Sequence, residues 1–370
     1  MRITWLSWKD INHPEAGGAE RVSDEIRIRL AESGHEVTLI TARYIDAKPE
    51  ENVRGVRVLR AGNRYSVYSK ARGLFRSLPE QDLVIDEMNT VPFFASFYRS
   101  KAPTILLTYQ LARQVWFYQM AFPFSYIGYW LEPIYLRLLS RRYKHVLTES
   151  ESTKKDLAKY GYAKSSVSVF RVGMDTPRPA SLPTHRIGYT VIFLGAFRPM
   201  KRPLDAIIAF EKARDLQPKL TLVMAGSTNG TYAQKVLEYV KSSRHSEAID
   251  IKGRVSEEQK ISLLKKADLI LVTSIKEGWG LIVTEANSQG TPGVVYDTDG
   301  LRDSVVADKT GLVVPSGDTS AMASAITRIL TNTKSYQELR QTAFTHSAQF
   351  TYTQSYKDFT SILAKAGLLK

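Results

Sequence analysis

The sequence predicts an α/β fold made of two doubly wound parallel sheets, one from each half of the chain. Short apolar runs rich in β-branched residues alternate with helical patterns from residue 3 to about residue 172, and the alternation restarts near residue 189. Between the two series lies a Pro-rich stretch without periodicity, as is typical of a linker. A chain of 370 residues is also long enough for two hydrophobic cores.

The expected elements follow from these patterns in chain order. In the first half, strands are expected at 3–8, 36–44, 56–61, 83–88, 104–107, 145–148 and 167–172, with a helix at 19–34. In the second half, strands are expected at 189–194, 220–225, 249–252, 269–272 and 293–296, with helices at 204–214, from 281 onward and at 354–366. We therefore expect domains at 1–176 and 187–351, with a linker at 177–186.

Composition and charge narrow the classes of function. The chain contains no cysteine, so disulfides and thiolate metal sites are excluded. Its net charge of +14 favours anionic partners such as nucleotides, an acidic membrane surface or nucleic acid. No helix-turn-helix, zinc-finger or RNP-like pattern supports nucleic acid, which we do not expect as a partner. No secretory signal is recognisable at the start, so we expect a cytoplasmic location.

The stretch 267–290 (ADLILVTSIKEGWGLIVTEANSQG) contains the most informative pattern, a buried strand followed by a glycine turn and a helix. Such a turn offers backbone N–H groups and a positive helix end to an anion. Glu277 and Glu285 flank the turn, and ionised carboxylates are acceptors that suit hydroxyl groups. A nucleotide-diphosphate sugar combines both kinds of group. The residues expected to line the donor between the two carboxylates are Gly278, Trp279, Gly280 and Leu281.

A second motif, 195–202 (GAFRPMKR), places cations between a strand and a helix, where they can reach a diphosphate. Arginine makes bidentate contacts with phosphate oxygens and lysine supplies a compact charge. Lys201 is the main candidate, and either Arg198 or Arg202 is expected to provide the second charge.

These motifs carry a resemblance to a known family. EGWGLIVTE resembles the E-x7-E signature of the retaining GT-B glycosyltransferases, in particular glycosyltransferase family 4, and GAFRPMKR is similar to the family's G-R-L-x-P-x-K-G. The resemblance covers nearly the whole chain. It implies a GT-B fold, with two Rossmann-like domains facing across a cleft, the donor on the second domain, and a last helix at about 352–370 that packs back on the first. Lys201 matches the family lysine, whereas Ala196 stands where the family has arginine.

The resemblance also implies roles for these residues in a metal-independent, retaining transfer without a cofactor. Lys201 and an arginine would stabilise the leaving diphosphate, Glu285 would bind the ribose, and Glu277 would bind the transferred hexose. Arg254, in a Gly-Arg-Val turn, would pack against the base. The expected function is transfer of a hexose from a UDP-, GDP- or related sugar to a glycan or lipid-linked acceptor, in cell-surface polysaccharide or glycolipid synthesis.

In the first half, the loop ending in Gly17 and Gly18 resembles the opening loop that lines the cleft in family 4. Many members carry a histidine after the strand that corresponds to 104–107. Here Tyr109 occupies that position and is followed by Gln110, so either side chain is expected to make the histidine's contact.

Three alternatives stay open. Asp297-Thr298-Asp299 matches the D-x-D pattern of metal-dependent GT-A enzymes, although we expect no metal because it follows a second-half strand. A GT-B-fold sugar-nucleotide epimerase would need acid and base groups that the motifs do not supply. A non-catalytic binder of anionic polymers would explain the positive charge but not the two glutamates.

The segment 114–139 is the most aromatic part of the chain, and four cations, at 137, 141, 142 and 144, lie at its end and just beyond it. Polar residues and Pro123 interrupt its apolar run, so a membrane-spanning helix is not expected. Two interpretations remain equal. One is a helix that lies on an anionic membrane surface or binds a lipid-linked acceptor, which would place the enzyme at the inner face of the cell membrane. The other is a core helix with a solvated basic end.

Overall fold

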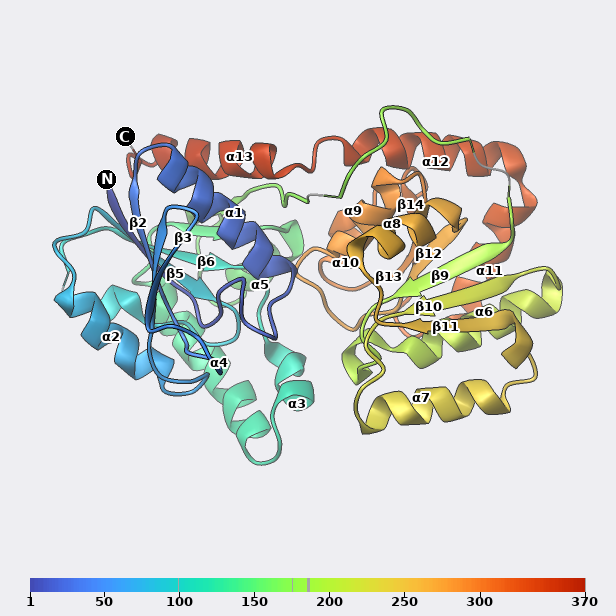
Figure 1. Cartoon of the computed structure of the whole chain (residues 1–370), viewed down its shortest axis with the longest axis horizontal. Coiled ribbons are helices and arrows are strands. Elements are labelled where there is room, and N and C mark those ends of the chain that lie inside the picture. Colours follow the sequence, from blue (N-terminus) through green and yellow to red (C-terminus); the bar gives the residue numbers. More distant parts are fainter. Residues whose placement is uncertain (99, 175, 185–186, 370) are drawn as a thin grey trace. The chain divides into compact units, whose positions relative to one another are not determined.

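The computed structural model describes residues 1–98, 100–174, 176–184 and 187–369. The chain forms two compact units, the first comprising Met1–Gly173 and Phe350–Lys370, the second Met174–Gln349. Parts of the expected domain boundaries, namely Asp175, His185, Arg186 and Lys370, lie outside the described residues. The predicted α/β class with two doubly wound sheets is confirmed, and Figure 1 shows helices on both faces of each sheet.

The first unit contains a sheet of eight strands in the order β3-β4-β2-β1-β5-β6-β7-β8. All neighbours pair in parallel except β3 and β4, which form an antiparallel edge. The strands are β1 Arg2–Leu6, β2 Glu36–Thr41, β3 Glu50–Val53, β4 Val56–Arg60, β5 Leu83–Met88, β6 Thr104–Thr108, β7 Val146–Thr148 and β8 Val167–Val169. β1 lies near the centre because apolar strands buried on both faces belong inside a parallel sheet.

The helices of this unit are α1 Gly18–Glu32, α2 Val67–Ser77, α3 Trp116–Gln119, α4 Phe124–Ser140, α5 Glu151–Ala158 and α13 Tyr352–Lys365. The last of these comes from the end of the chain. Phe359 of α13 stacks on Trp5 of β1, with ring centroids 5.7 Å apart. Asp358 accepts two hydrogen bonds from the Arg171 guanidinium, at 2.6 and 2.9 Å. Apolar stacking and a bidentate ion pair therefore hold the last helix on the first unit.

The second unit contains a fully parallel sheet in the order β11-β10-β9-β12-β13-β14. Its strands are β9 Thr190–Leu194, β10 Thr221–Ala225, β11 Ile249–Gly253, β12 Leu269–Val272, β13 Gly293–Tyr296 and β14 Gly311–Val314. Its helices are α6 Pro203–Leu216, α7 Thr231–Ser242, α8 Glu257–Lys266, α9 Leu281–Ser288, α10 Leu301–Ser304, α11 Thr319–Thr331 and α12 Thr333–Ser347. The order reverses at β9 and β12, so the carboxyl ends of these two neighbouring strands form a topological switch point.

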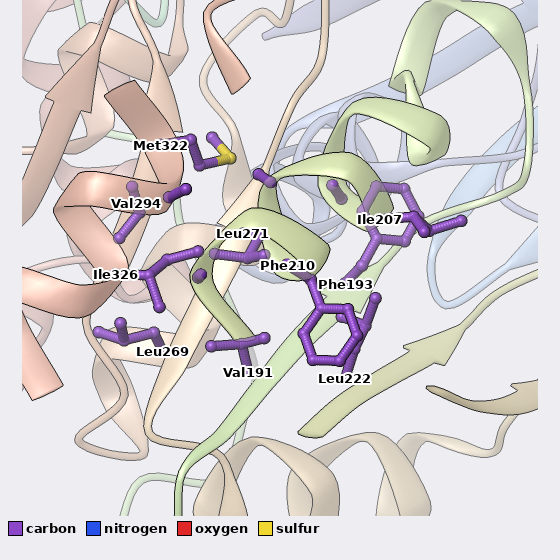
Figure 2. Close-up of a cluster of buried hydrophobic side chains, with 14 of the residues drawn as sticks. Val191, Phe193, Ile207, Phe210, Leu222, Leu269, Leu271, Val294, Met322 and Ile326 are labelled. Carbon is purple, nitrogen blue, oxygen red and sulfur yellow. The ribbon is translucent and has the colours of Figure 1, made fainter. Parts of the chain in front are cut away.

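Alternation along the strands builds the two cores of this unit. Leu269 and Leu271 of β12 point into the larger core, shown in Figure 2, together with Phe210 of α6 and Ile326 of α11. Ile270 and Val272 face the opposite side, toward α8 and α9. A strand buried on both faces is held rigidly, so the turn that leaves it starts from a fixed position.

Two strands were not predicted from the sequence. β3 has the sequence EENV, which carries no apolar signal, and it joins β4 through a tight turn at Arg54 and Gly55, both with positive φ. β14 has only four residues and follows β13 after a connection that contains the short helix α10. Very short edge strands are the elements that periodicity detects least well, because three or four residues carry too little pattern.

Candidate functional site

The predicted donor site lies at the switch point of the second unit, where the loops leaving β9 and β12 meet. The loop after β9 contains a 3₁₀ turn, Pro199–Lys201, and the loop after β12 runs to α9. The Thr273 hydroxyl donates to the carbonyls of Lys201 and Arg202, at 2.8 Å each. The amide of Ile275 donates to the carbonyl of Met200 at 2.9 Å. The two loops that carry the sequence motifs are thus tied together through their backbones.

Lys201 and Glu277 meet directly at this junction. The Lys201 Nζ lies 2.5 Å from Glu277 Oε1. The lysine side chain is 37% exposed and the glutamate 18%, so both groups reach solvent while paired. A half-exposed ion pair contributes little to stability, typically about 0–1 kcal/mol, because water screens it. The pair can therefore open and give each charge to a ligand at small cost.

Glycines allow the turn after Glu277 to pack closely. A Cβ on Gly300 would lie 2.3 Å from the Glu277 carbonyl oxygen, so only glycine fits there. The Glu277 amide donates to the Asp299 carbonyl at 3.1 Å, which fixes the turn from the same side. Gly280 precedes the first residue of α9 with φ of 93°, a conformation that glycine adopts without strain. Leu281 begins the helix, so the helix end predicted to face an anion is present.

Glu285 lies on α9 and pairs with a lysine that no sequence motif singles out. Lys260 Nζ of α8 lies 2.9 Å from Glu285 Oε1 and 2.7 Å from Glu257 Oε2. Burial alone would lower the pKa of Lys260, but the two carboxylates outweigh it and the pKa is raised. The charged lysine therefore holds Glu285 in one position.

The three candidate arginines differ in their surroundings. Arg198 is exposed at the start of the 3₁₀ turn. Arg202 adopts a left-handed conformation with φ of 46°, and its guanidinium lies 3.6 Å from Asp205. Arg254 is exposed at the end of β11 and lines a depression with Gln259 and other residues of α8. Arg202 is the only one of these three with a carboxylate partner in the described part of the chain.

Trp279 is held against the helix that follows it. Its indole N–H donates to the Thr284 hydroxyl at 2.9 Å. Together with Gly278 and Gly280 it forms the half-buried turn between Glu277 and the first residue of α9. The indole therefore braces the turn against the first part of the helix.

The D-x-D segment is engaged in ion pairs. Arg302 lies 2.6 Å from a carboxylate oxygen of Asp297 and 2.6 Å from one of Asp299, and Lys276 lies 3.3 Å from the second oxygen of Asp299. Within the described residues, no group of three or more His, Cys, Asp or Glu side chains could hold a metal ion.

In the first unit, Gly17 and Gly18 are exposed at the start of α1. The Gly17 amide donates to Glu20 Oε2 at 2.7 Å, and Lys9 Nζ lies 3.2 Å from Glu20 Oε1. Glu20 is 4% exposed and Asn89 also donates to it at 3.3 Å. This carboxylate fixes the loop, and only the G-G-A-E spacing could have indicated it.

Tyr109 and Gln110, which follow β6, differ in burial and in hydrogen bonding. Tyr109 is 4% exposed, and its hydroxyl lies 2.5 Å from the Ser23 hydroxyl of α1. Ser23 donates to Glu87, which also accepts from the Trp5 indole at 2.6 Å. Gln110 is only half buried, and its amide oxygen has no hydrogen-bond partner within the described structure. The tyrosine is thus engaged in the core, whereas the glutamine oxygen is buried without a partner in the described structure.

Lys260 was missed for a physical reason. Its segment, EEQK in the first turns of α8, has the pattern of an ordinary solvated helix. The contact with Glu285 joins residues 25 apart on separate helices, and sequence spacing carries no signal for it.

Comparison with known families gives one match for each half. The model described as Glycosyltransferase Family 4 matches residues 16–178, and the model described as Glycosyl transferases group 1 matches residues 182–346. A glycogen synthase of Mycobacterium tuberculosis is 28% identical over 195 residues, which are 52% of this chain and 47% of that protein. A D-inositol 3-phosphate glycosyltransferase of Corynebacterium diphtheriae is 29% identical over 48% of this chain and 42% of its own. The matched region spans less than half the length of either relative.

Solved structures match the whole fold. Sucrose-phosphate synthase of Thermosynechococcus elongatus superposes with a TM-score of 0.78 at 17% identity, covering 99% of this chain and 98% of that one. Anabaena HepE in complex with UDP-glucose gives a TM-score of 0.74 at 16% identity, covering 99% and 100%. The two domain families between them account for most of the sequence, and these structures account for the architecture of the whole chain. The chain therefore has the GT-B fold, and each of its halves matches a glycosyltransferase family.

Proposed function

We propose that this protein is a retaining glycosyltransferase that moves a hexose from a nucleotide-diphosphate sugar to a glycan or lipid-linked acceptor. The observation that carries the proposal is the contact of Lys201 with Glu277 at the carboxyl ends of β9 and β12. A cation for the diphosphate and a carboxylate for sugar hydroxyls stand side by side there. Neither a polymer binder nor a simple phosphate site calls for that combination.

The proposed reaction breaks the bond between the anomeric carbon and the diphosphate oxygen. Negative charge then develops on the leaving diphosphate, where Lys201 and the N–H groups at the start of α9 stabilise it. The acceptor hydroxyl attacks from the same face of the sugar, and its proton passes to the departing phosphate oxygen. Positioning and charge stabilisation thus supply most of the rate enhancement.

The remaining donor contacts are assigned from the side chains present. Glu285, held by Lys260, accepts from the ribose hydroxyls, and Glu277 accepts from the hexose. Arg254 packs at the base, in the depression beside α8. Arg198, exposed and next to Lys201 in the same turn, provides the second charge on the diphosphate in preference to Arg202, which already faces Asp205.

The names of similar proteins support a sugar-transfer role. One similar structure contains UDP-glucose, and other similar proteins are named glycogen synthase, D-inositol 3-phosphate glycosyltransferase and sucrose-phosphate synthase. For this chain we propose a role in cell-surface polysaccharide or glycolipid synthesis. We propose a cytoplasmic location, with peripheral contact at the inner face of the cell membrane.

The test is release of UDP, GDP or ADP from a panel of sugar nucleotides, with and without glycan and lipid-linked acceptors. One nucleotide should be released faster with its cognate acceptor, and the anomeric configuration of the product should match that of the donor. Inversion of configuration would contradict the retaining mechanism, and no release from any donor would contradict the reaction class.

Metal independence is tested in the same assay. Because cationic side chains and helix N–H groups supply the charge stabilisation, EDTA should leave the rate unchanged. Loss of activity with EDTA and its recovery with Mg²⁺ or Mn²⁺ would show that the Asp297–Asp299 segment, or another site, holds a catalytic ion.

A further inference from the structure

A helical hairpin of the first unit presents apolar side chains to solvent. The hairpin consists of α3, a turn and α4, residues 116–140, and in Figure 1 it extends away from the sheet of its own unit. Its outward residues are from 49% to 79% exposed. We call them the apolar stripe: Phe122, Phe124, Ile127, Trp130, Leu131 and Ile134. Contiguous apolar surface of this kind marks an interaction site.

The first part of helix α4 is amphipathic in the inverted sense. Its buried positions there are Ser125, Gly128 and Glu132, and Leu136 and Leu139 are buried only toward the end of the helix, whereas large apolar residues occupy the exposed face of the first part. A helix whose only task was to cover the sheet would bury the apolar side and expose the polar one. The apolar exposed face therefore indicates that this side of α4 contacts an apolar partner outside the protein.

Buried hydrogen bonds and close packing fix the position of the hairpin. Glu132 is fully buried and accepts hydrogen bonds from the amides of Ala112 and Arg113, at 2.7 and 2.6 Å. It also accepts from the Trp116 indole at 3.0 Å. A Cβ on Gly128 would lie 2.4 Å from the Trp116 ring, so glycine is required for the two helices to pack this closely. The exposed stripe is thus held on a defined surface.

Charge identifies the partner. Residues 89–148 contain a single acidic residue, the buried Glu132. Exposed cations stand in the last turn of α4 and just beyond it, at Arg137, Arg141, Arg142 and Lys144. An apolar stripe bordered by cations, with no exposed acid in the segment, matches the acyl boundary and the anionic headgroups of a lipid bilayer.

A second copy of this chain fits the face less well. In a two-fold dimer formed through the stripe, the same segment of the second copy would bring no exposed acidic residue to face these cations. A spanning helix is also excluded for the described residues, since none of their helices is long and apolar enough to cross a bilayer. The 17 residues of α4 rise only about 25 Å, less than the roughly 30 Å of a hydrocarbon core.

We propose that the α3–α4 hairpin docks the protein on membranes that contain anionic phospholipid, with the apolar stripe entering the headgroup–acyl boundary. The cations at the end of α4 lie over the headgroups. This inference identifies the surface behind the peripheral location proposed above, and it does not depend on the proposed reaction.

Flotation with two kinds of vesicle tests the docking. The full chain should float with vesicles of equal parts phosphatidylcholine and phosphatidylglycerol at about 50 mM salt, and much less with phosphatidylcholine alone or at about 500 mM. Absence of flotation with the anionic vesicles at low salt would overturn the proposal. Flotation that is equal with both vesicles would overturn the role given to the cations.

Surface variants locate the contact. The triple change Phe122→Ser, Trp130→Ser and Ile134→Ser should lower the partition coefficient at least about 100-fold, because three apolar contacts are lost. The matched control is Ile45→Ser with Leu216→Ser, which removes apolar side chains of similar exposure, 87% and 70%, elsewhere on the chain. If the triple variant bound as the wild type does, the stripe would not be the docking surface.

The charge contribution has its own pair of variants. Arg141→Gln with Lys144→Gln should weaken binding to anionic vesicles about 25-fold, or about fivefold for each charge. Lys235→Gln with Lys241→Gln, exposed cations of α7, serves as the control that lowers the net charge equally. Equal weakening by both pairs would show that net charge, and not this patch, drives binding.

Fluorescence quenching measures insertion directly. Brominated acyl chains should quench the fluorescence of Trp130, and Trp130→Phe should remove most of that quenching. Quenching that persists in the variant would contradict insertion of the stripe.

Sedimentation equilibrium separates membrane docking from self-association. It should show the same oligomeric state for the wild type and the triple variant. A dimer that the triple variant dissociates would assign the face to a second copy and overturn the proposal. Donor binding in solution should be unchanged in the triple variant, so failure of the proposed reaction and failure of docking are read separately.

Discussion

The two sheets share one architecture but use their carboxyl ends differently. In the second unit, the charged groups that follow β9 and β12 are partly exposed, with Lys201 at 37% and Glu277 at 18%. In the first unit, the titratable side chains at the ends of β5 and β6 are buried. Glu87 at the end of β5 is 1% exposed, and Tyr109 after β6 is 4% exposed.

The difference lies in what each group can do when a ligand arrives. The ion pair of Lys201 and Glu277 is partly exposed to water, so a ligand can replace each partner at little cost in free energy. The network of Glu87, Ser23 and Tyr109 is buried, and breaking any bond in it would leave an unsatisfied polar group at a cost of about 1–3 kcal/mol. We infer that the second unit supplies the charges for binding a nucleotide sugar, whereas the buried network of the first unit maintains its shape.

The sharpest way to break this comparison is Lys201→Ala. Loss of a cation that stabilises the leaving diphosphate should lower kcat/KM for the sugar nucleotide by roughly 100-fold or more. Lys219→Ala, an exposed lysine outside the site, is the matched control. Steady-state kinetics together with donor titration measure the effect. Unchanged donor affinity and turnover in Lys201→Ala would remove the diphosphate role.

Glu277→Gln should have a smaller effect on the same reaction. The amide still reaches the hexose but no longer makes charged hydrogen bonds with its hydroxyls, so turnover should fall about tenfold. Glu238→Gln on α7 removes an exposed carboxylate away from the turn and should leave the rate unchanged. A Glu277→Gln enzyme as fast as the wild type would contradict the hexose contact.

The contrast also explains what the sequence could predict. Periodicity and branching located β12 and its glycine turn, because a strand buried on both faces reads as the continuous run LILV. The same reasoning placed Lys201 and Glu277 each in a loop that follows a strand of the second half, and the structure makes these strands neighbours and brings the two side chains into contact. Within one unit, parallel topology converts motifs distant in sequence into neighbours.

Contacts between side chains of separate helices could not be predicted from periodicity and motif spacing. Lys260 reaches Glu285 from a helix whose pattern is ordinary for a solvated surface. Tyr109 could be assigned a position in the chain but not a direction, since its burial depends on Ser23 of α1. The exposed face of α4 was equally undetermined, because an apolar run predicts burial without saying whether protein or lipid covers it.

The buried network of the first unit makes a prediction about pH. Burial raises the pKa of Glu87 to about 7 from an ordinary value of 4.5, although Arg27 opposes the shift. Between these two values the folded state holds a proton that the unfolded state has released. Stability from this group is therefore greatest below about pH 4.5 and falls as the pH rises toward 7.

Glu87→Gln should remove that slope. Unfolding in urea at about pH 5, 6 and 7 should show the wild type losing stability relative to the variant by roughly 1 kcal/mol per pH unit. Glu36→Gln, a change at an exposed carboxylate of the same unit, should keep the wild-type slope. Parallel pH profiles for the wild type and Glu87→Gln would show that Glu87 is ionised in the fold throughout this range.

The smallest effects of mutation on turnover are expected at Tyr109 and Gln110, where a buried side chain is followed by a half-buried one. We propose that Gln110 makes the contact that histidine makes in many family members, because its amide oxygen is unengaged while the Tyr109 hydroxyl bonds with Ser23. Gln110→Ala should slow turnover by roughly threefold, the loss of one hydrogen bond to a neutral sugar, and leave stability nearly unchanged. Tyr109→Phe should do the reverse, lowering the free energy of unfolding by about 1 kcal/mol while turnover stays within about twofold. Kinetics and urea unfolding of both variants decide between the two side chains. If Tyr109 contacted the sugar, Tyr109→Phe would give the larger kinetic loss. That result would show that the first unit also offers reactive groups at its strand ends.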